Sequence, residues 1–211
     1  MANANEKKNY QIIMEHMISE IKEQGSTPRL LLHSCCAPCS SYCLETLTQH
    51  FKISVFYYNP NIYPDEEYYK REKEQQWFIE KFPAANPIEF VQAPYEKDIF
   101  YEMAEGMEDV PEGGERCMKC YRLRLGKAAQ YAAENGYDYF TTTLSISPHK
   151  NAQALNLIGK ELAQKYGVSY LYSDFKKKNG FKRSCEISEE YGIYRQDYCG
   201  CEFSVRNNIS E

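Results

Sequence analysis

Short apolar runs alternate along this sequence with longer stretches of helical pattern, and this alternation strongly limits the folds open to the chain. The apolar runs are rich in branched and aromatic residues, and they occupy residues 29–34, 52–58, 88–92, 137–143 and 169–172. The helical stretches repeat apolar side chains every three or four positions, and they occupy residues 6–24, 41–50, 65–82, 116–134 and 151–166. Strands that alternate with helices predict an α/β fold with a mostly parallel sheet and helices on both faces.

The chain length fits one domain with small appendages. A chain of 211 residues is long enough for one sizeable core and short for two. We therefore expect a single α/β domain over residues 1–211, with an N-terminal helix in residues 1–25 and a C-terminal extension in residues 174–211. The extension is basic, interrupted by glycine and rich in tyrosine, and we expect it to lie over the functional site.

Charge and hydropathy restrict the environment of the protein. The formal net charge is −5, which argues against a surface that binds nucleic acid everywhere. Residues 101–115 contain six acidic and no basic residues, whereas residues 176–183 contain five basic and no acidic ones. The basic segment is either a solvated loop or a patch that contacts phosphates. Since no apolar run of about 18 residues occurs and the first 25 residues are charged, we expect a cytoplasmic protein without a membrane partner.

The loops that follow the predicted strands are the expected place for chemistry. Ligands of open parallel sheets bind at the carboxyl ends of the strands. The loops after the first, second and fourth strands are HSCCAPCSS at 33–41, NPNIYPDE at 59–66 and LSISPHKN at 144–151. All three are polar, and the first is the most reactive because it holds three cysteines.

Nine cysteines are many for a cytosolic chain, and their odd number excludes a complete set of disulfides. They form three groups and one singleton: Cys35, Cys36, Cys39 and Cys43; Cys117 and Cys120; Cys185; and Cys199 and Cys201. Packing alone does not favour such grouping, so we expect metal binding or redox chemistry. Cys43 and Cys185 are better explained as small, buried hydrophobic residues.

The first and second groups together supply enough sulfur for a metal centre. Cys117 and Cys120 are three residues apart at a predicted helix start, which puts both thiols on one face. The helix N-terminus and two neighbouring basic side chains are expected to lower the pKa of both thiols. With Cys35 and Cys36 they make four ligands, as a tetrahedral zinc or a [4Fe-4S] cluster needs. Adjacent cysteines favour the cluster, because its iron atoms are separate attachment points.

Other interpretations of the cysteines stay open. Cys36 and Cys39 enclose two residues, follow a strand and open a helix, which is also the arrangement of a thioredoxin motif. Cys199 and Cys201 flank a glycine and can close a small, strained disulfide that is easily cycled. The alternatives for this pair are two free thiols, or two ligands that hold a second metal together with Cys39.

Five motifs together are highly specific. They are HSCCAPC at 33–39, FYYNPNIYP at 56–64, GGERCMKCYRLRL at 113–125, TTLSISPHK at 142–150 and KRSCEISEEYGIYRQDYCGC at 182–201. By these motifs the chain resembles, from Arg29 to Phe203, the QueH family of epoxyqueuosine reductases of queuosine biosynthesis. The resemblance implies a Rossmann-like fold related to the adenine-nucleotide alpha hydrolase and ATP pyrophosphatase (HUP) group. A cysteine loop replaces the phosphate loop of those enzymes, and no SGGxDS-type loop is present, so ATP use is not implied.

The resemblance also implies site residues. The family's [4Fe-4S] cluster ligands correspond to Cys35, Cys36, Cys117 and Cys120. Its redox-active disulfide corresponds to Cys199 with Cys201. Some relatives hold a further metal, and members differ at the position of Cys39, which can ligate a second iron or zinc here.

The implied reaction reduces the epoxide of epoxyqueuosine at the wobble position of tRNA to the alkene of queuosine, with loss of water. It requires two electrons and two protons, hence an electron donor protein that the sequence does not identify. Candidate proton donors are His149, Asp197 and Tyr198, whereas His33 is as easily explained as a core histidine. Candidate RNA contacts are aromatic and basic residues: Tyr57, Tyr58, Tyr63, Lys176, Lys177, Lys178, Lys182 and Arg183.

Two other functions use the same cysteines. The chain is alternatively a thiol–disulfide oxidoreductase that works with Cys36 and Cys39, or a zinc-stabilised RNA-binding module without catalysis. The oxidoreductase would not depend on Cys117. The RNA-binding module would carry zinc and be colourless.

Overall fold

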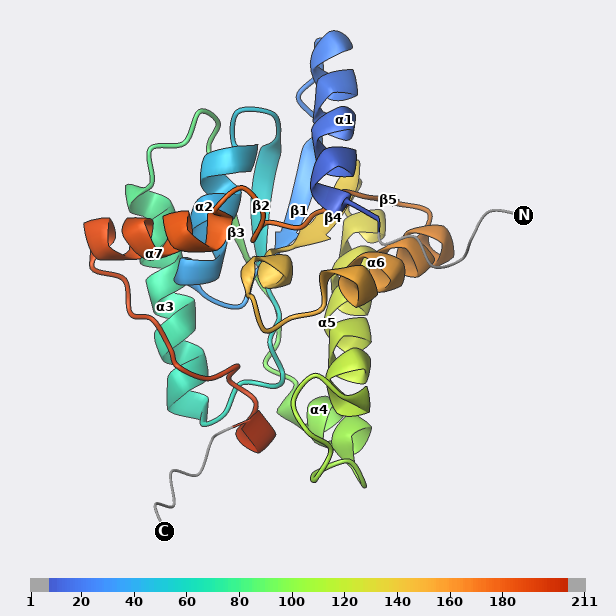
Figure 1. The fold of residues 1–211 in the computed structure, drawn as a ribbon, viewed down its shortest axis with the longest axis vertical. Coiled ribbons are helices and arrows are strands. Elements are labelled where there is room, and N and C mark those ends of the chain that lie inside the picture. The colour runs from blue at the N-terminus through green and yellow to red at the C-terminus, as the bar shows by residue number, and fades with distance from the viewer. Residues whose placement is uncertain (1–7, 205–211) are drawn as a thin grey trace.

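The computed structural model describes residues 8–204, within which the chain forms a five-stranded sheet covered by helices (Figure 1). The strand order is β3-β2-β1-β4-β5, and every neighbouring pair is parallel. The predicted α/β fold with a parallel sheet is therefore confirmed. The strands are β1 (Arg29–His33), β2 (Lys52–Tyr57), β3 (Glu89–Gln92), β4 (Tyr139–Thr142) and β5 (Ser169–Tyr170).

The described residues also form seven α-helices, of which five correspond to predicted ones. The helices are α1 (Tyr10–Glu23), α2 (Ala37–Leu47), α3 (Asp65–Lys81), α4 (Lys97–Ala104), α5 (Glu115–Glu134), α6 (Ala152–Tyr166) and α7 (Gly180–Tyr191), with short 3₁₀ helices η1 (Thr143–Ile146) and η2 (Glu202–Ser204). The start of the predicted N-terminal helix and the end of the predicted extension, residues 205–211, lie outside the described part. No helix in residues 8–204 combines the length and apolar character needed to cross a membrane.

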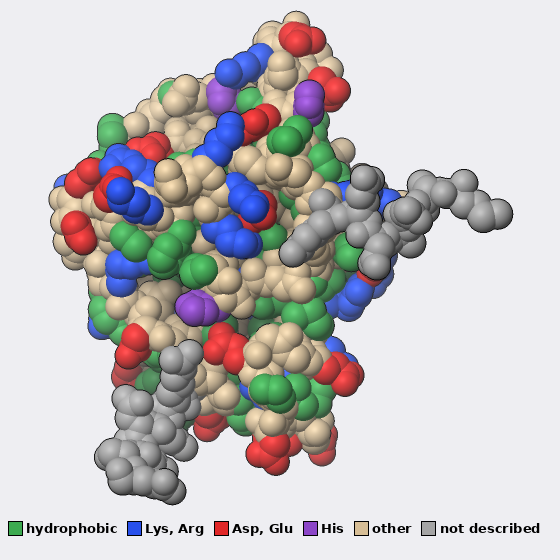
Figure 2. All heavy atoms as spheres, in the orientation of Figure 1, with side chains coloured by type: hydrophobic (Ala, Val, Ile, Leu, Met, Phe, Trp, Pro, Cys, Tyr) green, Lys and Arg blue, Asp and Glu red, His purple; other side chains and the backbone are tan. Residues whose placement is uncertain are grey.

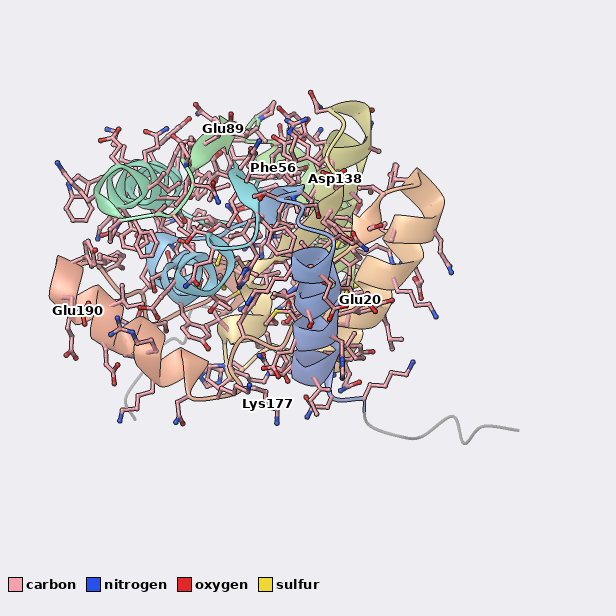
Figure 3. The ribbon with its side chains drawn as sticks, turned by 90° about the horizontal axis from the view of Figure 1, so that it is seen from above. Glu20, Phe56, Glu89, Asp138, Lys177 and Glu190 are labelled. Atoms are coloured by element: carbon pink, nitrogen blue, oxygen red, sulfur yellow. The ribbon has the colours of Figure 1, made fainter. Side chains whose placement is uncertain are left out.

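β1 lies at the centre of the sheet, and both of its faces are covered. Leu30 and Leu32 pack into an apolar cluster with α1, α2, α3 and α7, whereas Leu31 packs into a second cluster with α5 and α6. This alternation follows from strand geometry, because successive side chains point to opposite faces. Seen from above, α1 and α7, which carry Glu20 and Glu190, lie on the same side of the row of strands (Figure 3).

The strand order places a switch point between β1 and β4. From β1 the chain proceeds through β2 to β3, and it then crosses to β4 and β5 on the other side of β1. His33 at the end of β1 is in register with Thr142 at the end of β4. Loops that leave two neighbouring strands in opposite directions open a crevice, which is where such sheets bind ligands.

The start of α2 differs from the prediction and matters for the site. The helix begins at Ala37 instead of residue 41, and Pro38 lies in its first turn. A first turn accepts proline because the missing N–H would have no partner there. Neither Ser40 nor Ser41 caps the helix, and Cys36 occupies the N-cap position.

Two helices were not predicted at all. α4 lies in a segment for which no helix or strand was predicted, and it buries only Phe100 and Ala104 over its 8 residues. α7 lies in the expected C-terminal extension, between Gly180 and Gly192, and buries Ile187. Helices this short depend on tertiary packing more than on their own pattern, so a single sequence gives little sign of them.

Candidate functional site

A cavity of about 390 Å³ lies beyond the carboxyl ends of β1 and β4. Residues from the loop after β1, the loop after β4, α5, α7 and segment 195–199 line it, and they include Cys35, Cys39 and Cys199. Two of the three predicted loops, 33–41 and 144–151, thus contribute directly. The third predicted loop, 59–66, contributes indirectly: its Asn59 accepts a hydrogen bond of 2.6 Å from Nη2 of Arg124, which lines the cavity.

Cys35, Cys36 and Cys39 form a compact thiol group. Their Sγ atoms all lie within 4.8 Å of one another, and those of Cys35 and Cys36 are 3.7 Å apart. The arrangement arises because Cys36, the extended N-cap residue of α2, turns the chain between the strand end and the first helical turn. Thiolates are soft ligands that suit zinc and iron–sulfur clusters, so this group could bind a metal.

The three thiols of this group shift the pKa values of one another. Hydrogen bonds from Cys36 and Cys39 lower the pKa of Cys35 well below its usual value. Burial raises the pKa of Cys36 to about 12, and the hydrogen bonds to its two neighbours raise the pKa of Cys39 as well. Because a metal binds thiolates, its binding releases the protons that these cysteines carry.

These pKa shifts argue against the thioredoxin interpretation of Cys36 and Cys39. A thiol–disulfide enzyme needs an accessible thiol with a low pKa. Cys36 is fully buried, and its pKa is raised. The lowered pKa belongs to Cys35, which lies outside the motif.

Cys117 and Cys120 lie near the start of α5, as predicted, but the expected lowering of their pKa is wrong. Burial raises the pKa of Cys120 to about 11 and also raises that of Cys117, since desolvation outweighs the helix terminus. Cys117 packs against the apolar cluster that contains Cys35 and Cys36, and Cys120 belongs to a small cluster with Cys201. The helical pair therefore adjoins both other cysteine groups.

Cys199 and Cys201 are free thiols in this structure, and the disulfide between them stays a prediction. Cys199 lines the cavity, and its Sγ atom accepts a hydrogen bond of 3.4 Å from Nζ of Lys150. Cys201 is buried, which raises its pKa to about 12. Gly200 between them has a φ of +96°, a conformation that residues with a side chain rarely adopt.

Two positive side chains that were not predicted lie between the cysteine groups. Arg124 is 1% exposed; its charge adds to the lowering of the pKa of Cys35 by hydrogen bonds and opposes the rise that burial causes in the pKa of Cys120. Burial opposes the charge of Lys150, but the electrostatic interaction with nearby side chains, Cys199 foremost, raises its pKa. Arg124 is recognisable in the sequence as the residue four positions after Cys120, on the same face of the helix. No comparable signal marks Lys150.

Gln196 and Arg71, also not predicted, support the most deeply buried cysteine. Nε2 of Gln196 donates a hydrogen bond of 2.9 Å to Sγ of Cys36. Arg71 is fully buried and donates to Glu67 at 2.6 Å, and its charge partly opposes the rise that burial causes in the pKa of Cys36. Within the described residues, its two terminal nitrogens have no hydrogen-bond partner. Outer partners of this kind orient metal ligands.

Two of the three tyrosines expected to contact RNA are internal, so that prediction was wrong for them. Tyr57 and Tyr58 are 0% and 1% exposed, and the hydroxyl of Tyr57 donates to the carbonyl oxygen of Tyr68 at 2.9 Å. A ring without exposed surface cannot stack on a base. Tyr63 is 43% exposed and remains available.

The basic segment 176–183 is mostly ion-paired, as a solvated surface would be. Basic and acidic side chains are interspersed on this face of the molecule (Figure 2). Lys182 is left almost free, with its nearest carboxylate 3.9 Å away. Three of the five cations have closer partners: Lys176 with Asp174, Lys178 with Glu15, and Arg183 with Glu45.

The three candidate proton donors, His149, Asp197 and Tyr198, all line the cavity. The hydroxyl of Tyr198 donates a hydrogen bond of 2.7 Å to the carbonyl oxygen of Tyr63. Its proton is therefore engaged in holding the segment. His149 and Asp197 are left as the available donors of the three.

His33 and Cys43 belong to the core. The ring nitrogens of His33 bond to Thr142 Oγ1 at 2.9 Å and to the Tyr58 carbonyl oxygen at 3.1 Å, and burial lowers the pKa of the ring to about 3. Cys43 is fully buried, as predicted. Cys185 is only half-buried, so the prediction of burial was wrong for this residue.

Comparisons with known proteins identify the family of this chain. Residues 30–207 match the family model described as Epoxyqueuosine reductase QueH. The protein of that name from Streptococcus pyogenes serotype M1 is 45% identical over 206 residues, which cover 97% of this chain and 81% of the relative. Those from Staphylococcus epidermidis and Thermotoga maritima are 45% and 36% identical, over 95% and 83% of this chain and 86% and 90% of their own lengths. The chain belongs to the QueH family of epoxyqueuosine reductases.

Proposed function

We propose that this reductase works with a [4Fe-4S] cluster and a redox-active dithiol. The cluster is held by Cys35, Cys36, Cys117 and Cys120, and the dithiol consists of Cys199 and Cys201. One observation carries the proposal: the three cysteine groups adjoin a single cavity. Cys35 and Cys199 line it, while Cys117 and Cys120 pack against the apolar clusters of the first and last groups.

The surrounding residues fit an anionic iron–sulfur centre. Cysteine thiolates are the usual ligands of such clusters. Arg124 and Lys150 have no carboxylate partner among the described residues, although Arg124 is buried and Lys150 lies against Cys199. Burying a positive charge is unfavourable unless a negative group compensates it. The thiolates and the centre that they bind supply that negative charge.

Cys39 is left as a ligand for a second metal, iron or zinc. Its Sγ atom lies within 4.8 Å of those of Cys35 and Cys36, and it lines the cavity. A metal there would be bound beside the cluster, on the side that the substrate enters.

The reaction removes the epoxide oxygen as water. Two C–O bonds break, a C=C bond forms, and two electrons and two protons are consumed. Oxidation of the thiols of Cys199 and Cys201 to a disulfide supplies both the electrons and the protons, after which an external donor reduces the disulfide again. The cluster, when bound, would supply one-electron transfer, and a metal held by Cys39 would stabilise negative charge on the departing oxygen.

Residues of the chain control charge and protons in the cavity. The ammonium group of Lys150, 3.4 Å from Sγ of Cys199, stabilises negative charge that develops nearby. His149 and Asp197 line the same cavity and can deliver a proton to the departing oxygen. The hydroxyl of Tyr198 positions the segment instead, because it is bonded to the backbone of Tyr63.

The fold and the partners follow from the same proposal. The order β3-β2-β1-β4-β5 equals the first five strands of a Rossmann sheet, which supports a relation to the HUP group. The cysteine loop stands after β1, where nucleotide-binding members of such folds carry their phosphate loop. The substrate is tRNA that carries epoxyqueuosine, the second partner is an electron donor protein, and the reaction takes place in the cytoplasm.

Anaerobic reconstitution tests the cluster. We expect about four iron and four sulfide ions per chain, and conversion of epoxyqueuosine to queuosine in an anticodon stem-loop RNA, measured by mass spectrometry of its nucleosides. Cys117→Ser should abolish both, whereas Cys185→Ser serves as the matched control. Fewer than about four irons per chain would overturn the cluster, and a colourless protein with stoichiometric zinc would favour an RNA-binding module.

A cellular experiment tests the substrate independently of the cofactor. Cells without this gene should accumulate epoxyqueuosine in their tRNA, and the wild-type gene should restore queuosine. Unchanged queuosine in a cell without a second reductase would contradict the assignment.

A further inference from the structure

An exposed aromatic ring and an unpaired arginine stand together at the rim of the cavity. Phe181, on α7, is 38% exposed, and Arg195 follows this helix on the C-terminal segment. Both residues line the cavity together with Cys35 and Cys199. The guanidinium carbon of Arg195 lies over the ring of Phe181, 5.5 Å from its centre. The pair therefore offers a flat, positively charged surface next to the reactive thiols.

The pair is held in place by the rest of the fold. α7 packs so closely at its start that a Cβ atom on Gly180 would overlap with the carbonyl oxygen of Phe175, which fixes the position of the neighbouring Phe181. Nη1 of Arg195 donates to the Ser184 carbonyl oxygen at 3.1 Å and to Oγ of Ser188 at 3.0 Å. An exposed ring and cation that are fixed in advance lose little conformational entropy when a ligand binds.

The charge of Arg195 is available to a ligand. In residues 8–204, Arg195 forms no ion pair with a carboxylate, whereas Arg183 on α7 pairs with Glu45, Glu186 and Glu190. Most acidic residues of segment 102–115 lie on α4 and the following loop (Figure 1), although Glu112 lines the cavity. Arg195 stands at the α7 side of the rim, so the positive charge that attracts an anionic chain lies on that side.

We infer that Phe181 and Arg195 bind a nucleotide that flanks epoxyqueuosine in the anticodon loop, with the base stacked on this pair and its phosphate at Arg195. The inference rests on the proposed function, because it takes tRNA as the substrate. A cavity of about 390 Å³ accommodates one modified nucleoside, so the next nucleotide must lie at the rim. Proteins hold unstacked loop bases on aromatic rings and guanidinium planes and bind the adjoining phosphates with cations.

The inference also explains why the residues expected from the sequence are not the contact. The rings of Tyr57 and Tyr58 are buried, and most of the basic segment is ion-paired. Phe181 lies within that segment but is neither basic nor a tyrosine. Arg195 is separated from it by most of α7, and the two meet only in the folded chain.

Binding of RNA by the reconstituted full-length chain tests the inference. The probe is an anticodon stem-loop RNA with unmodified guanosine at the wobble position, whose dissociation constant is measured by fluorescence anisotropy over a range of salt concentrations. Phe181→Ala should weaken binding about tenfold, the effect of losing one stacked base, and Phe181→Tyr should retain wild-type affinity. Arg195→Ala should also weaken binding, and should reduce the salt dependence by about one phosphate contact.

Two control variants separate this effect from a general change of surface. Trp77→Ala removes a ring on α3 that is 41% exposed, and Lys165→Ala removes an exposed cation from α6. Neither residue lines the cavity, so both variants should bind RNA as the wild type does.

The possible outcomes distinguish this inference from the proposed function. If the wild type binds the RNA and reduces epoxyqueuosine while Phe181→Ala and Arg195→Ala bind within about twofold of it, the rim contact is wrong and the function stands. If the wild type binds the RNA through Phe181 but leaves epoxyqueuosine unreduced, the proposed chemistry is wrong and the contact stands. If the wild type does not bind the RNA, the rim serves another partner and the inference is overturned.

Discussion

The first and last cysteine groups of the site are built in opposite ways. Cys36 and Cys39 lie on the cap and first turn of α2, directly after the central strand, so sheet and helix bonds fix their backbone. Cys199 lies between α7 and η2, on a segment with no regular secondary structure. The first group is suited to hold a cofactor in one geometry. The last is suited to move between thiol and disulfide, since opening a segment with few backbone bonds requires little free energy.

The last group is nevertheless held by a few specific hydrogen bonds. The backbone N–H of Tyr63 donates to the Gly200 carbonyl oxygen at 2.8 Å, and that of Tyr194 donates to Oε1 of Glu74 at 2.7 Å. Gln196 reaches Sγ of Cys36. The segment is thus attached to the rigid part at separate points, one of which is a proposed cluster ligand.

The largest expected effect comes from the first cysteine group. Cys36→Ser should abolish cluster binding and lower the turnover rate by more than the roughly 100-fold that loss of an outer partner causes, because it removes a ligand from the centre of the site. Iron content after anaerobic reconstitution and the rate of queuosine formation measure both effects. Cys185→Ser is the control. A variant that retains wild-type iron and activity would show that Cys36 is not a ligand.

The second prediction concerns the last cysteine group, Cys199 and Cys201. The double replacement Cys199→Ser and Cys201→Ser should lower turnover about 100-fold or more, since both electrons and both protons are supplied there, while the iron content stays at the wild-type level. Iron assays and single-turnover measurements with reduced protein check the two parts. Loss of iron in this variant would remove the division between a region that holds the cofactor and a region that exchanges electrons.

The third prediction tests the connection between the two regions. Gln196→Ala removes the 2.9 Å hydrogen bond to Sγ of Cys36 without changing a ligand, and should weaken metal binding about tenfold. Titration of the apoprotein with cobalt(II) in competition with a chelator measures this affinity. Gln153→Ala, which removes an exposed amide bonded to the Lys8 carbonyl oxygen, should have no effect. Equal affinities of both variants would mean that the C-terminal segment does not support the cluster site.

The rigid part of the molecule is also the part that the sequence predicts best. The structure confirms all five predicted strands and the predicted helices α5 and α6. Each of these elements is buried on one or two faces, and this burial leaves a regular apolar pattern in the sequence. α4 and α7 are short and bury few side chains, so their helices depend on contacts with the rest of the fold. The sequence alone shows how the cysteines are grouped, because this grouping depends only on their positions along the chain.

The charges around the cysteines could not be predicted in the same way. Their pKa shifts depend on burial, which raised the pKa of Cys120 to about 11 although it lies near a helix start. Lys150 and Gln196 meet Cys199 and Cys36 only after the chain has folded. A tyrosine in a sequence can lie either at the rim of a site or in the core, and its neighbours in the sequence do not distinguish the two. Tyr57 was therefore predicted as an RNA contact although it is buried.

The smallest expected effect comes from two glycine replacements. They compare Gly200, on the C-terminal segment, with Gly167, at the end of α6. Gly167 ends α6 with a φ of +70° and has open space where a Cβ would stand, whereas Gly200 has a φ of +96° and a Cβ there would lie 3.0 Å from Nη1 of the buried Arg71. Gly167→Ala should lower the free energy of unfolding by about 1 kcal/mol, because its helix cannot detach alone. Gly200→Ala should lower the free energy of unfolding by about 1–2 kcal/mol, because unfolding relieves the local strain, and should also raise the alkylation rate of Cys201 about tenfold, because opening of the segment relieves the same strain. A fall in global stability without faster alkylation would show that the segment unfolds only with the whole molecule, and the contrast between the two cysteine groups would then lie in their chemistry and not in their mobility.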